Sequence, residues 1–519
     1  MKKNVIVCMF DSLQFNYLGC YGNEWIKTPN FDRFAREGVL FENAYAEGMP
    51  TVPTRRVLQT GCVTLTHAGW SPLKSSDTTI ADMCWGQGID TALVFDCPMY
   101  RLPKYGYTRG YDQVFFTHGH EGDHAYYHKN PLIHLDAKNY LSKLQLEEGD
   151  KILDGDVVGP LLGEMEDFLR NRQYWHTEAD QNCPRVMKDA VKYLAERVDR
   201  NQQFFLWVDS FDPHEPWDPP SVYDPDMKCP YDPDYDGPDM FLPISGTVKD
   251  LYTEAELNHV RMLYAEKVTM VDNAFGYFMD KVRELGYEEN TLFIVISDHG
   301  EPMGNGEHGH GIMRKARPWP YEELVHIPLM IKGPGIPAGQ RITSMVQNYD
   351  ITATITNWLG IHGAEAMDSK DLMPLMTGQV EKIRDFCITG WYQSAWSIVT
   401  PKWSYIHWLV EQVLIQSMAG TNLVMHDGNA TGIAADDIAH FTADKEGLEA
   451  LERYKKGLTL DGADQWTCTP GSLREVPSED QLFDRETDPF QLNTIIHEHP
   501  EVARKLLNTL LTTMEDYKR

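Results

Sequence analysis

The sequence predicts an α/β fold, in which a doubly wound, mainly parallel sheet is followed by a smaller C-terminal subdomain with an antiparallel sheet. Up to residue 369, short continuous apolar runs alternate with segments of helical pattern. Such runs are typical of strands that are buried on both faces of a parallel sheet. From residue 370 the pattern changes to short stretches in which apolar and polar residues alternate, as in antiparallel strands. We therefore expect a larger domain at 1–369 and a subdomain at 370–519.

The expected elements follow one another in the order of a doubly wound fold. The first strand, at residues 4–10, is a continuous apolar run, and Thr28-Pro29-Asn30 begins a helix that Gly38 ends. Later strands of the sheet are expected at 39–45, 91–95, 204–208, 291–297 and 327–332, and later helices at 80–86, 184–199, 254–285 and 351–359. In the subdomain, the expected elements are strands at 396–399, 403–407 and 482–484, an insertion at 418–465 and a final helix at 499–518.

Two segments lack a regular pattern. Residues 221–250 are rich in Pro and Asp and are expected to be an excursion without regular structure. Residues 106–180 are also irregular, and they contain His118, His120, His124 and His128. These histidines could bind a metal ion, but their spacing is loose, so we expect a surface loop instead.

Composition and charge restrict the class of protein. The chain has 519 residues and a formal net charge of −30, which would repel both nucleic acid and anionic membrane surfaces. No signal peptide or membrane span is expected, because the first apolar run is short and ends in Asp11, and no later stretch has the length of a span. The nine cysteines show no metal-type spacing and are expected to be free thiols in a reducing cytoplasm.

Polar residues follow two of the predicted strands at their carboxyl ends. Asp11 follows the first strand, and Asp298 and His299 follow the strand at 291–297. Because the carboxyl ends of parallel strands meet at one edge of a doubly wound sheet, we expect these side chains to lie together. Two carboxylates and an imidazole suit a divalent metal ion.

The loop after the strand at 204–208 adds a histidine to this edge. His214 lies in the sequence Asp-Pro-His-Glu-Pro, and we expect it to contact a substrate or to donate a proton to a leaving group. The alternative is a loop histidine that is held by Asp209 or Asp212.

The stretch from Pro50 to Gly61 has the pattern of a short helix whose N-terminus can receive an anion. Pro53 suits the first turn of a helix, and Gly61 suits its end. Thr51 would then lie just ahead of the helix, where free N–H groups and the helix dipole favour an anion. Arg55, one turn further, adds a two-pronged donor for oxyanions. The stretch indicates either a hydroxyl nucleophile that faces a phosphate or sulfate, or an ordinary threonine-capped helix.

Motifs along most of the chain resemble, in the same order, those of the sulfatase branch of the alkaline-phosphatase superfamily. The matching segments are Asn4–Asp11, Leu18-Gly19-Cys20-Tyr21-Gly22, Thr28-Pro29-Asn30-Phe31-Asp32, Gly38–Tyr45, Pro53-x-Arg55, Thr60-Gly61, Ser297-Asp298-His299-Gly300-Glu301, Pro320-Tyr321-Glu322-Glu323, Ile327-Pro328-Leu329, and Leu482-Phe483-Asp484 through Asp488-Pro489. The resemblance implies an alkaline-phosphatase-like fold and the hydrolysis of a small anionic ester. It also implies one divalent ion, held by Asp11, Asp298, His299 and the hydroxyl of Thr51.

The residue at the nucleophile position departs from the family pattern. In sulfatases this residue is Cys or Ser and is oxidised to formylglycine, whereas Thr51 cannot give the aldehyde, and none of the nine cysteines precedes an x-Pro-x-Arg sequence. No formylglycine is therefore expected. A sulfated threonine would need attack at sulfur, whereas a phosphothreonine can be hydrolysed at phosphorus by water. Thr51 thus favours phosphate or phosphonate esters over sulfate esters.

Three further departures concern charge. The paired Asp of the family is Asp11-Ser12 here, as in the phosphonate monoester hydrolase and phosphodiesterase group. The family's Lys-x-His is replaced by Asp96-Cys97-Pro98, and Asp96 would repel a second anionic group or attract an amine. The second lysine of the family is displaced to Lys315 or replaced by Arg317.

These observations predict a metal-dependent hydrolase of phosphodiesters or phosphonate monoesters, in which Thr51 is the nucleophile and forms a covalent phospho-enzyme. Mn²⁺ or Ca²⁺ suits the oxygen-rich ligands, and Zn²⁺ is an alternative because of the histidine. Arg55 and His214 are expected to assist catalysis, and the expected substrate contacts are Lys315, Arg317, Asp96 and His310.

Three alternatives stay open: a sulfatase that tolerates threonine, a phosphomutase-like transferase, and a binding protein without activity. The last is disfavoured, because an abandoned site has no need of Asp11, Arg55, His214, Asp298 and His299 together. Residues 418–465 and the C-terminal helix are candidate surfaces for contact between copies of the chain.

Overall fold

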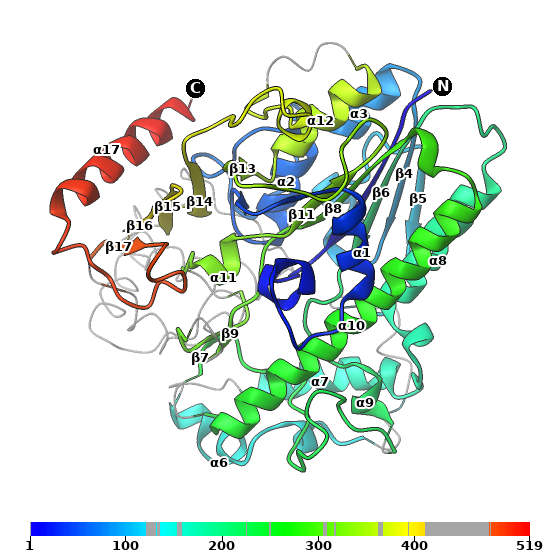
Figure 1. Cartoon of the computed structure of the whole chain (residues 1–519). Helices are drawn as coiled ribbons and strands as arrows, with labels where there is room; N and C mark the ends of the chain where they lie inside the picture. Colours follow the sequence, from blue (N-terminus) through cyan, green and yellow to red (C-terminus); the bar gives the residue numbers. More distant parts are fainter. Residues whose placement is uncertain are drawn as a thin grey trace.

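The chain is built around an eight-stranded, mainly parallel sheet between two layers of helices, with a separate four-stranded antiparallel sheet near the C-terminus (Figure 1). The α/β fold expected from the sequence is therefore confirmed. The computed structural model describes residues 2–120, 131, 135–152, 158–224, 226–248, 251–304, 309–315, 318–361, 367–392, 394–409, 477 and 479–518. The predicted insertion at 418–465 lies outside these residues, and the predicted boundary at 369 stays a prediction.

The strands of the large sheet follow the order β12-β2-β11-β8-β1-β6-β4-β5. All neighbouring pairs are parallel except those of β11, which runs antiparallel to both β2 and β8. The strands are β1 (Asn4–Phe10), β2 (Val39–Phe41), β4 (Asp90–Phe95), β5 (Gln113–Phe116), β6 (Phe204–Ser210), β8 (Thr291–Ser297), β11 (Leu329–Lys332) and β12 (Gln340–Ile342).

The central strand β1 shows why its sequence is apolar throughout. Ile6, Cys8 and Phe10 point into one core, and the alternate residues Val5, Val7 and Met9 point into the other, so both faces of the strand are buried. The first core is covered by α1 (Pro29–Glu37), α8 (Asn182–Glu196) and α10 (Glu254–Glu284), and the second by α2 (Thr51–Thr60), α3 (Ile80–Gly86) and α12 (Asp350–Leu359).

The small sheet forms the C-terminal part that the alternating pattern predicts. Its antiparallel strands are β14 (Cys387–Trp391), β15 (Ala395–Val399), β16 (Trp403–Trp408) and β17 (Gln481–Asp484). Leu506 and Leu510 of α17 (Pro500–Asp516) pack on Ile388 and Ile398 of this sheet. In Figure 1, α17 and this sheet lie at one end of the large sheet.

The prediction of an irregular surface loop at 106–180 is wrong in part. The structure places β5, α6 (Lys143–Ile152) and α7 (Val158–Arg172) in this range. Glycines within the two helices weaken their pattern in the sequence. His120 is fully buried, because its ring packs on Phe211 and its Nε2 lies 3.5 Å from Asp212 Oδ1. His124 and His128 lie outside the described residues.

The remaining elements are short. Residues 221–248 have little regular structure in their described part, as predicted. None of the helices in the described ranges is both long and apolar enough to cross a bilayer. The short elements are β3 (Ala44–Tyr45), β7 (Gly246–Thr247), β9 (Met303–Gly304), β10 (Ile312–Met313), β13 (Val346–Gln347), α4 (Pro98–Arg101), α9 (Pro220–Tyr223), α11 (Glu322–Val325), α13 (Met373–Met376), η1 (Phe15–Tyr17), η2 (Gly19–Tyr21), η3 (Pro103–Tyr105), η4 (Ala137–Tyr140), η5 (Glu178–Asp180) and η6 (Glu288–Asn290).

Candidate active site

The carboxyl ends of β1, β6 and β8 lie in register at one edge of the sheet. Phe10, the last residue of β1, pairs with Ser210 of β6 on one side and with Ser297 of β8 on the other. The ladder continues for one residue, because Asp11 N donates to Ser210 O at 2.9 Å. Asp11 and Asp298 follow equivalent strand positions and therefore lie beside each other, although they are far apart in sequence.

Asp11, Asp298 and His299 form a group that can hold a divalent metal ion. One candidate ligand atom from each lies within 4.8 Å of the others, and all three residues have an exposed fraction of 0%. His299 Nδ1 donates to Gly300 O at 2.8 Å, so the lone pair of Nε2 faces the carboxylates. Burial lowers the pKa of His299 to about 4, which keeps the ring neutral at neutral pH. Two carboxylates and a neutral imidazole fit a divalent ion.

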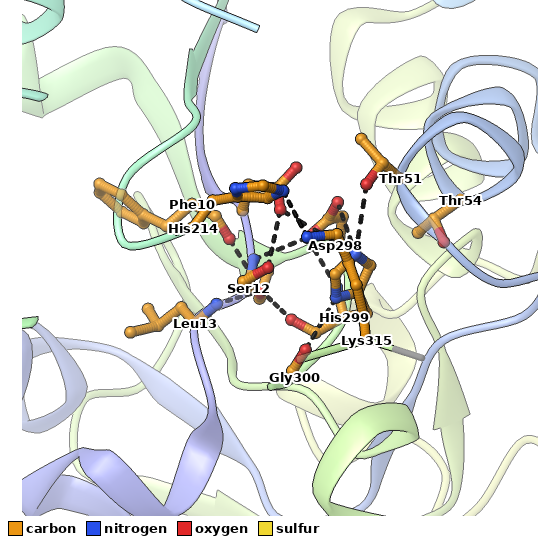
Figure 2. Close-up of polar contacts among 12 residues, drawn as sticks. Phe10, Ser12, Leu13, Thr51, Thr54, His214, Asp298, His299, Gly300 and Lys315 are labelled. Atoms are coloured by element: carbon orange, nitrogen blue, oxygen red, sulfur yellow. Dashed lines mark hydrogen bonds and ion pairs between the residues drawn. The ribbon is translucent and has the colours of Figure 1, made fainter. Parts of the chain in front are cut away.

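The turn after β1 fixes the two carboxylates in place (Figure 2). Ser12 has a φ of 60°, which is rare for a residue with a side chain, and its N–H donates to Asp298 Oδ1 at 3.1 Å. Tyr264 of α10 supports the turn from behind, since its hydroxyl donates to Ser12 O at 2.7 Å and accepts from Gln14 N at 2.9 Å. Ser12 Oγ donates to Asp11 Oδ1 at 2.9 Å, so this position supplies a hydrogen bond where the family has a second aspartate.

Thr51 lies at the N-terminus of α2 and points toward the metal-ligand group (Figure 2). Its Oγ is 3.4 Å from His299 Nε2, and the residue is 1% exposed. Thr51 is the first residue of the helix rather than the residue ahead of it, and Pro50 occupies the N-cap position. Pro53 has no N–H and Thr54 N donates to Pro50 O at 3.0 Å, so Thr51 and Val52 are the residues of the first turn whose N–H groups the helix leaves without a partner. The anion site at this N-terminus stays a prediction.

Arg55 connects three buried carboxylates. Its Nη1 donates to Asp11 Oδ2 and to Asp298 Oδ2, both at 2.8 Å. Its Nε and Nη2 donate to the two oxygens of Asp209 at 3.1 and 2.7 Å. Burial and the charge of Asp11 raise the pKa of Asp298 well above its ordinary value, because two carboxylates in one dry site repel each other. One guanidinium therefore faces more negative charge than it can balance.

A second group of charges lies beside Asp11 and contains His214 and Lys315. The ammonium of Lys315 contacts His214 Nε2 and lies 3.0 Å from Glu215 Oε1. Arg314 Nε donates to the same oxygen of Glu215 at 2.6 Å. His214 Nδ1 donates to Glu215 O at 2.5 Å, so Nε2 carries no proton and accepts from Lys315. Burial lowers the pKa of His214 to about 3, and within this pair Lys315 is therefore the group with a proton to give.

The other predicted substrate contacts lie elsewhere or outside the described residues. Asp96 is fully buried behind the loop that carries His214, and its Oδ1 accepts from Phe211 N at 2.6 Å. His310 stacks on Tyr321, and its Nδ1 lies 3.0 Å from Glu323 Oε1. Arg317 lies outside the described residues. The substrate contacts of Asp96, His310 and Arg317 stay predictions.

Two residues of the site were not singled out by the sequence. The sequence indicates Asp209 only as a possible partner of His214, but Asp209 pairs with Arg55 from a position near the end of β6, after five apolar residues. An acidic residue in a strand that is buried on both faces needs a buried cation, and this was the available signal. Glu215 adjoins His214 in the loop, and its carboxylate accepts from Arg314 and Lys315.

Comparisons with known proteins agree with this geometry. Residues 3–361 match the family model described as Sulfatase. An arylsulfatase of Clostridium perfringens is 26% identical over 412 residues, which cover 74% of this chain and 81% of that protein. The multifunctional alkaline phosphatase superfamily protein PehA of Trinickia caryophylli is 25% identical over 449 residues, which cover 72% of this chain and 77% of that protein.

The fold is also that of a solved hydrolase. The phosphonate monoester hydrolase of Agrobacterium radiobacter aligns with a TM-score of 0.66 and 18% identity, over 99% of this chain and 96% of that chain. The strand order, the ligand group at the sheet edge and the matched family model together identify the protein: the chain is a hydrolase of the sulfatase family, within the alkaline-phosphatase superfamily.

Proposed function

We propose that this chain is a metal-dependent hydrolase of phosphodiesters or phosphonate monoesters, with Thr51 as the nucleophile. The observation that carries the proposal is the position of Thr51 Oγ, 3.4 Å from His299 Nε2 at the N-terminus of α2. Asp11, Asp298 and His299 would hold the ion. We propose Mn²⁺ or Ca²⁺ for this site, with Zn²⁺ as the alternative. When bound, the ion would supply Lewis acidity and lower the pKa of the nearby hydroxyl.

Each of the other steps of the reaction is assigned to a residue of the chain. Thr51 loses its hydroxyl proton to solvent, and its Oγ forms a bond to phosphorus while the bond to the leaving oxygen breaks, which gives a phosphothreonine. Lys315 gives a proton to the leaving oxygen, and His214 holds the ammonium in position. Water then attacks phosphorus and the bond to Thr51 Oγ breaks. The hydroxyl of this water stays on phosphorus, its proton restores the hydroxyl of Thr51, and Lys315 regains its proton from solvent. The N–H groups at the start of α2 stabilise the charge that develops on the transferred group.

A sulfatase with a threonine nucleophile is the second candidate, and the names of the relatives favour it. A threonine sulfate would need attack at sulfur, because threonine lacks the second hydroxyl by which hydrated formylglycine expels sulfate. The two candidates differ in their substrates. A panel of chromogenic mono- and diesters of phosphate, and of sulfate monoesters, assayed with added Mn²⁺, Ca²⁺ or Zn²⁺, separates them.

The nucleophile is tested by trapping. A slowly hydrolysed phosphodiester should add a phosphoryl mass to the wild-type chain in intact-mass analysis. Thr51→Ala should form no adduct and should lose activity by on the order of 10³-fold or more, whereas Thr51→Ser, which keeps the hydroxyl, should stay active. Thr54→Ala is the matched control, because Thr54 lies in the same turn but donates to Gly48 O at 2.5 Å. Wild-type turnover by Thr51→Ala without any adduct would refute the assignment.

A further inference from the structure

The ion pair between Arg55 and Asp209 lies beside the proposed nucleophile. Arg55 follows Thr51 by one helical turn, and its Nη1 lies 3.4 Å from Thr51 O. Asp209 Oδ1 and Oδ2 accept from Nη2 and Nε at 2.7 and 3.1 Å, and both side chains have an exposed fraction of 0%. This two-pronged contact is the strongest type of ion pair between these side chains. The positive charge nearest to Thr51 on its own helix is thus matched by a carboxylate from β6.

We propose that Asp209 is a specificity-determining residue, which cancels the charge of Arg55 and so favours substrates whose transferred group carries one negative charge over those that carry two. Phosphodiesters and phosphonate monoesters carry a single charge at neutral pH, whereas phosphate monoesters carry between one and a half and two. The inference rests on the proposed function, since it concerns the same site.

The surroundings of Asp209 strengthen the effect of its charge on a bound substrate. The guanidinium of Arg55 is enclosed by Asp11, Asp298, Asp209 and the rings of Tyr100 and Phe211, whose centroids lie 5.5 and 5.8 Å from it. Water therefore screens the charges only weakly. Across the site, Arg314 and Lys315 share the carboxylate of Glu215, and Lys315 also faces Glu301. Removal of the negative charge at 209 adds one positive charge to the site as a whole.

The expected effect follows from the difference of one charge between the two substrate classes. For unit charges about 7 Å apart at an effective dielectric constant of about 20, one added charge changes the preference for a dianion over a monoanion by about 10- to 50-fold. Asp209→Asn keeps the shape of the side chain and removes only its charge.

The experiment compares two esters with the same leaving group. We would measure kcat/KM for p-nitrophenyl phosphate and for bis(p-nitrophenyl) phosphate across the pH range in which the monoester takes its second charge. Asp209→Asn and the wild type share every other titratable group near the site, so the difference between their two pH profiles reports the charge at position 209. The wild-type ratio of monoester to diester should fall as pH rises through about 6, the second pKa of such an ester, and Asp209→Asn should flatten this fall. At high pH the variant should raise the ratio by about 10- to 50-fold.

A binding measurement separates this inference from the proposed function. Titration calorimetry with inorganic phosphate and with dimethyl phosphate needs no turnover, and Asp209→Asn should strengthen only the binding of inorganic phosphate. If the wild type cleaves neither phosphate ester, the proposed function fails, and the calorimetry still decides the role of Asp209.

Control variants test whether a change in the substrate ratio results from a loss of structure. Asp350, at the start of α12, forms another buried ion pair with Arg384. Asp350→Asn removes this carboxylate and should change the melting temperature but not the ratio of monoester to diester. Asp209→Glu retains the charge and should keep the wild-type ratio. If Asp209→Asn does not fold, Asp209→Ser gives the same comparison. An equal fall in both rates, or a wild-type ratio that does not depend on pH, would overturn the inference.

Discussion

Two fully buried ionic clusters adjoin the loop that carries His214, and they differ in charge balance. In the site cluster, Arg55 faces three carboxylates, Asp11, Asp209 and Asp298. In the support cluster, two cations, Arg172 and Lys267, face two carboxylates, Asp212 and Asp218. All of these side chains have an exposed fraction of 0%. The balanced cluster is complete as it stands, whereas the site cluster has room for the charge of a further cation.

The support cluster fixes the geometry of the loop. Lys267 of α10 bridges the two ends of the loop, since its Nζ lies 3.1 Å from Asp212 Oδ1 and 2.8 Å from Asp218 Oδ1. Arg172 of α7 holds Asp218 from the other side. His214 lies between these anchored ends. We interpret the balanced buried charge as structural here, and the unbalanced buried charge as the mark of the candidate site.

The largest expected effect is on stability, from the loss of the bridging lysine. Lys267→Met leaves two buried carboxylates with too little positive charge, and should lower the free energy of unfolding by about 3–5 kcal/mol. Urea unfolding measures the loss. A loss below about 1 kcal/mol would mean that Asp212 and Asp218 find other partners, and would weaken the distinction between the clusters.

Arg55→Met is the corresponding change in the site cluster. It should also destabilise the protein in the presence of a chelator, but added Mn²⁺ should restore part of the loss, because an ion between Asp11 and Asp298 replaces the missing charge. Lys267→Met should gain no more from Mn²⁺ than the wild type does. Equal gains for both variants would contradict the proposed difference.

The second prediction concerns the ion itself. Mn²⁺ or Ca²⁺ at 100 to 1,000 times its dissociation constant should stabilise the apo protein by about 2.7–4.1 kcal/mol, seen as a rise in melting temperature. Asp298→Asn should abolish the rise. Asp218→Asn is the control, since it should lower the melting temperature and keep the rise. The metal assignment would be contradicted if elemental analysis found no bound metal and added metal caused no rise in melting temperature.

The third prediction concerns the proton on Lys315. Lys315→Met should lower kcat by about 10²-fold on an ester with a poor leaving group and by much less on p-nitrophenyl esters, whose leaving oxygen needs no proton. His214→Ala should show the same dependence in weaker form, because the ring positions Lys315. Unchanged turnover of the poor substrate by His214→Ala would leave this residue a purely structural role.

The smallest expected effect is the pH dependence of stability. Burial lowers the pKa of His214 to about 3 and that of His299 to about 4, from 6.5. Between pH 6.5 and about 4 the unfolded chain binds protons at these positions and the folded chain does not, so the free energy of unfolding falls as pH falls. Each residue should contribute about 1–3 kcal/mol across this window. Urea titrations of His214→Gln and His299→Gln should show a shallower slope than the wild type.

The sequence predicts the parts of the site that depend on local pattern. Asp11 and Asp298-His299 follow unbroken apolar strands, and parallel strands bring such positions together whatever lies between them. The N-terminus of α2 was predicted to within one residue from Pro53 and Gly61. These features need no knowledge of distant contacts.

The parts of the site that the sequence does not predict depend on contacts between distant segments. The partner of Arg55 is Asp209, 154 residues away, and no local pattern indicates which buried acid meets which buried base. The burial of His120 likewise depends on Phe211 and Asp212 of a later loop. The sequence does not predict the helices α6 and α7, because their apolar faces are interrupted. Their stability depends on packing against other segments.

The helix α10 has a consequence for how this chain can vary. Over its 31 residues it meets three separate segments: Tyr264 supports the turn after β1, Lys267 bridges the loop after β6, and Asp272 accepts from Phe31 N at the start of α1 at 2.7 Å. One inserted residue would rotate everything beyond it by about 100° and shift it by about 1.5 Å, so two of these contacts could not survive together. Chains that share this site should therefore differ in length at the ends of α10 and in the loops, and keep the spacing between positions 264 and 272.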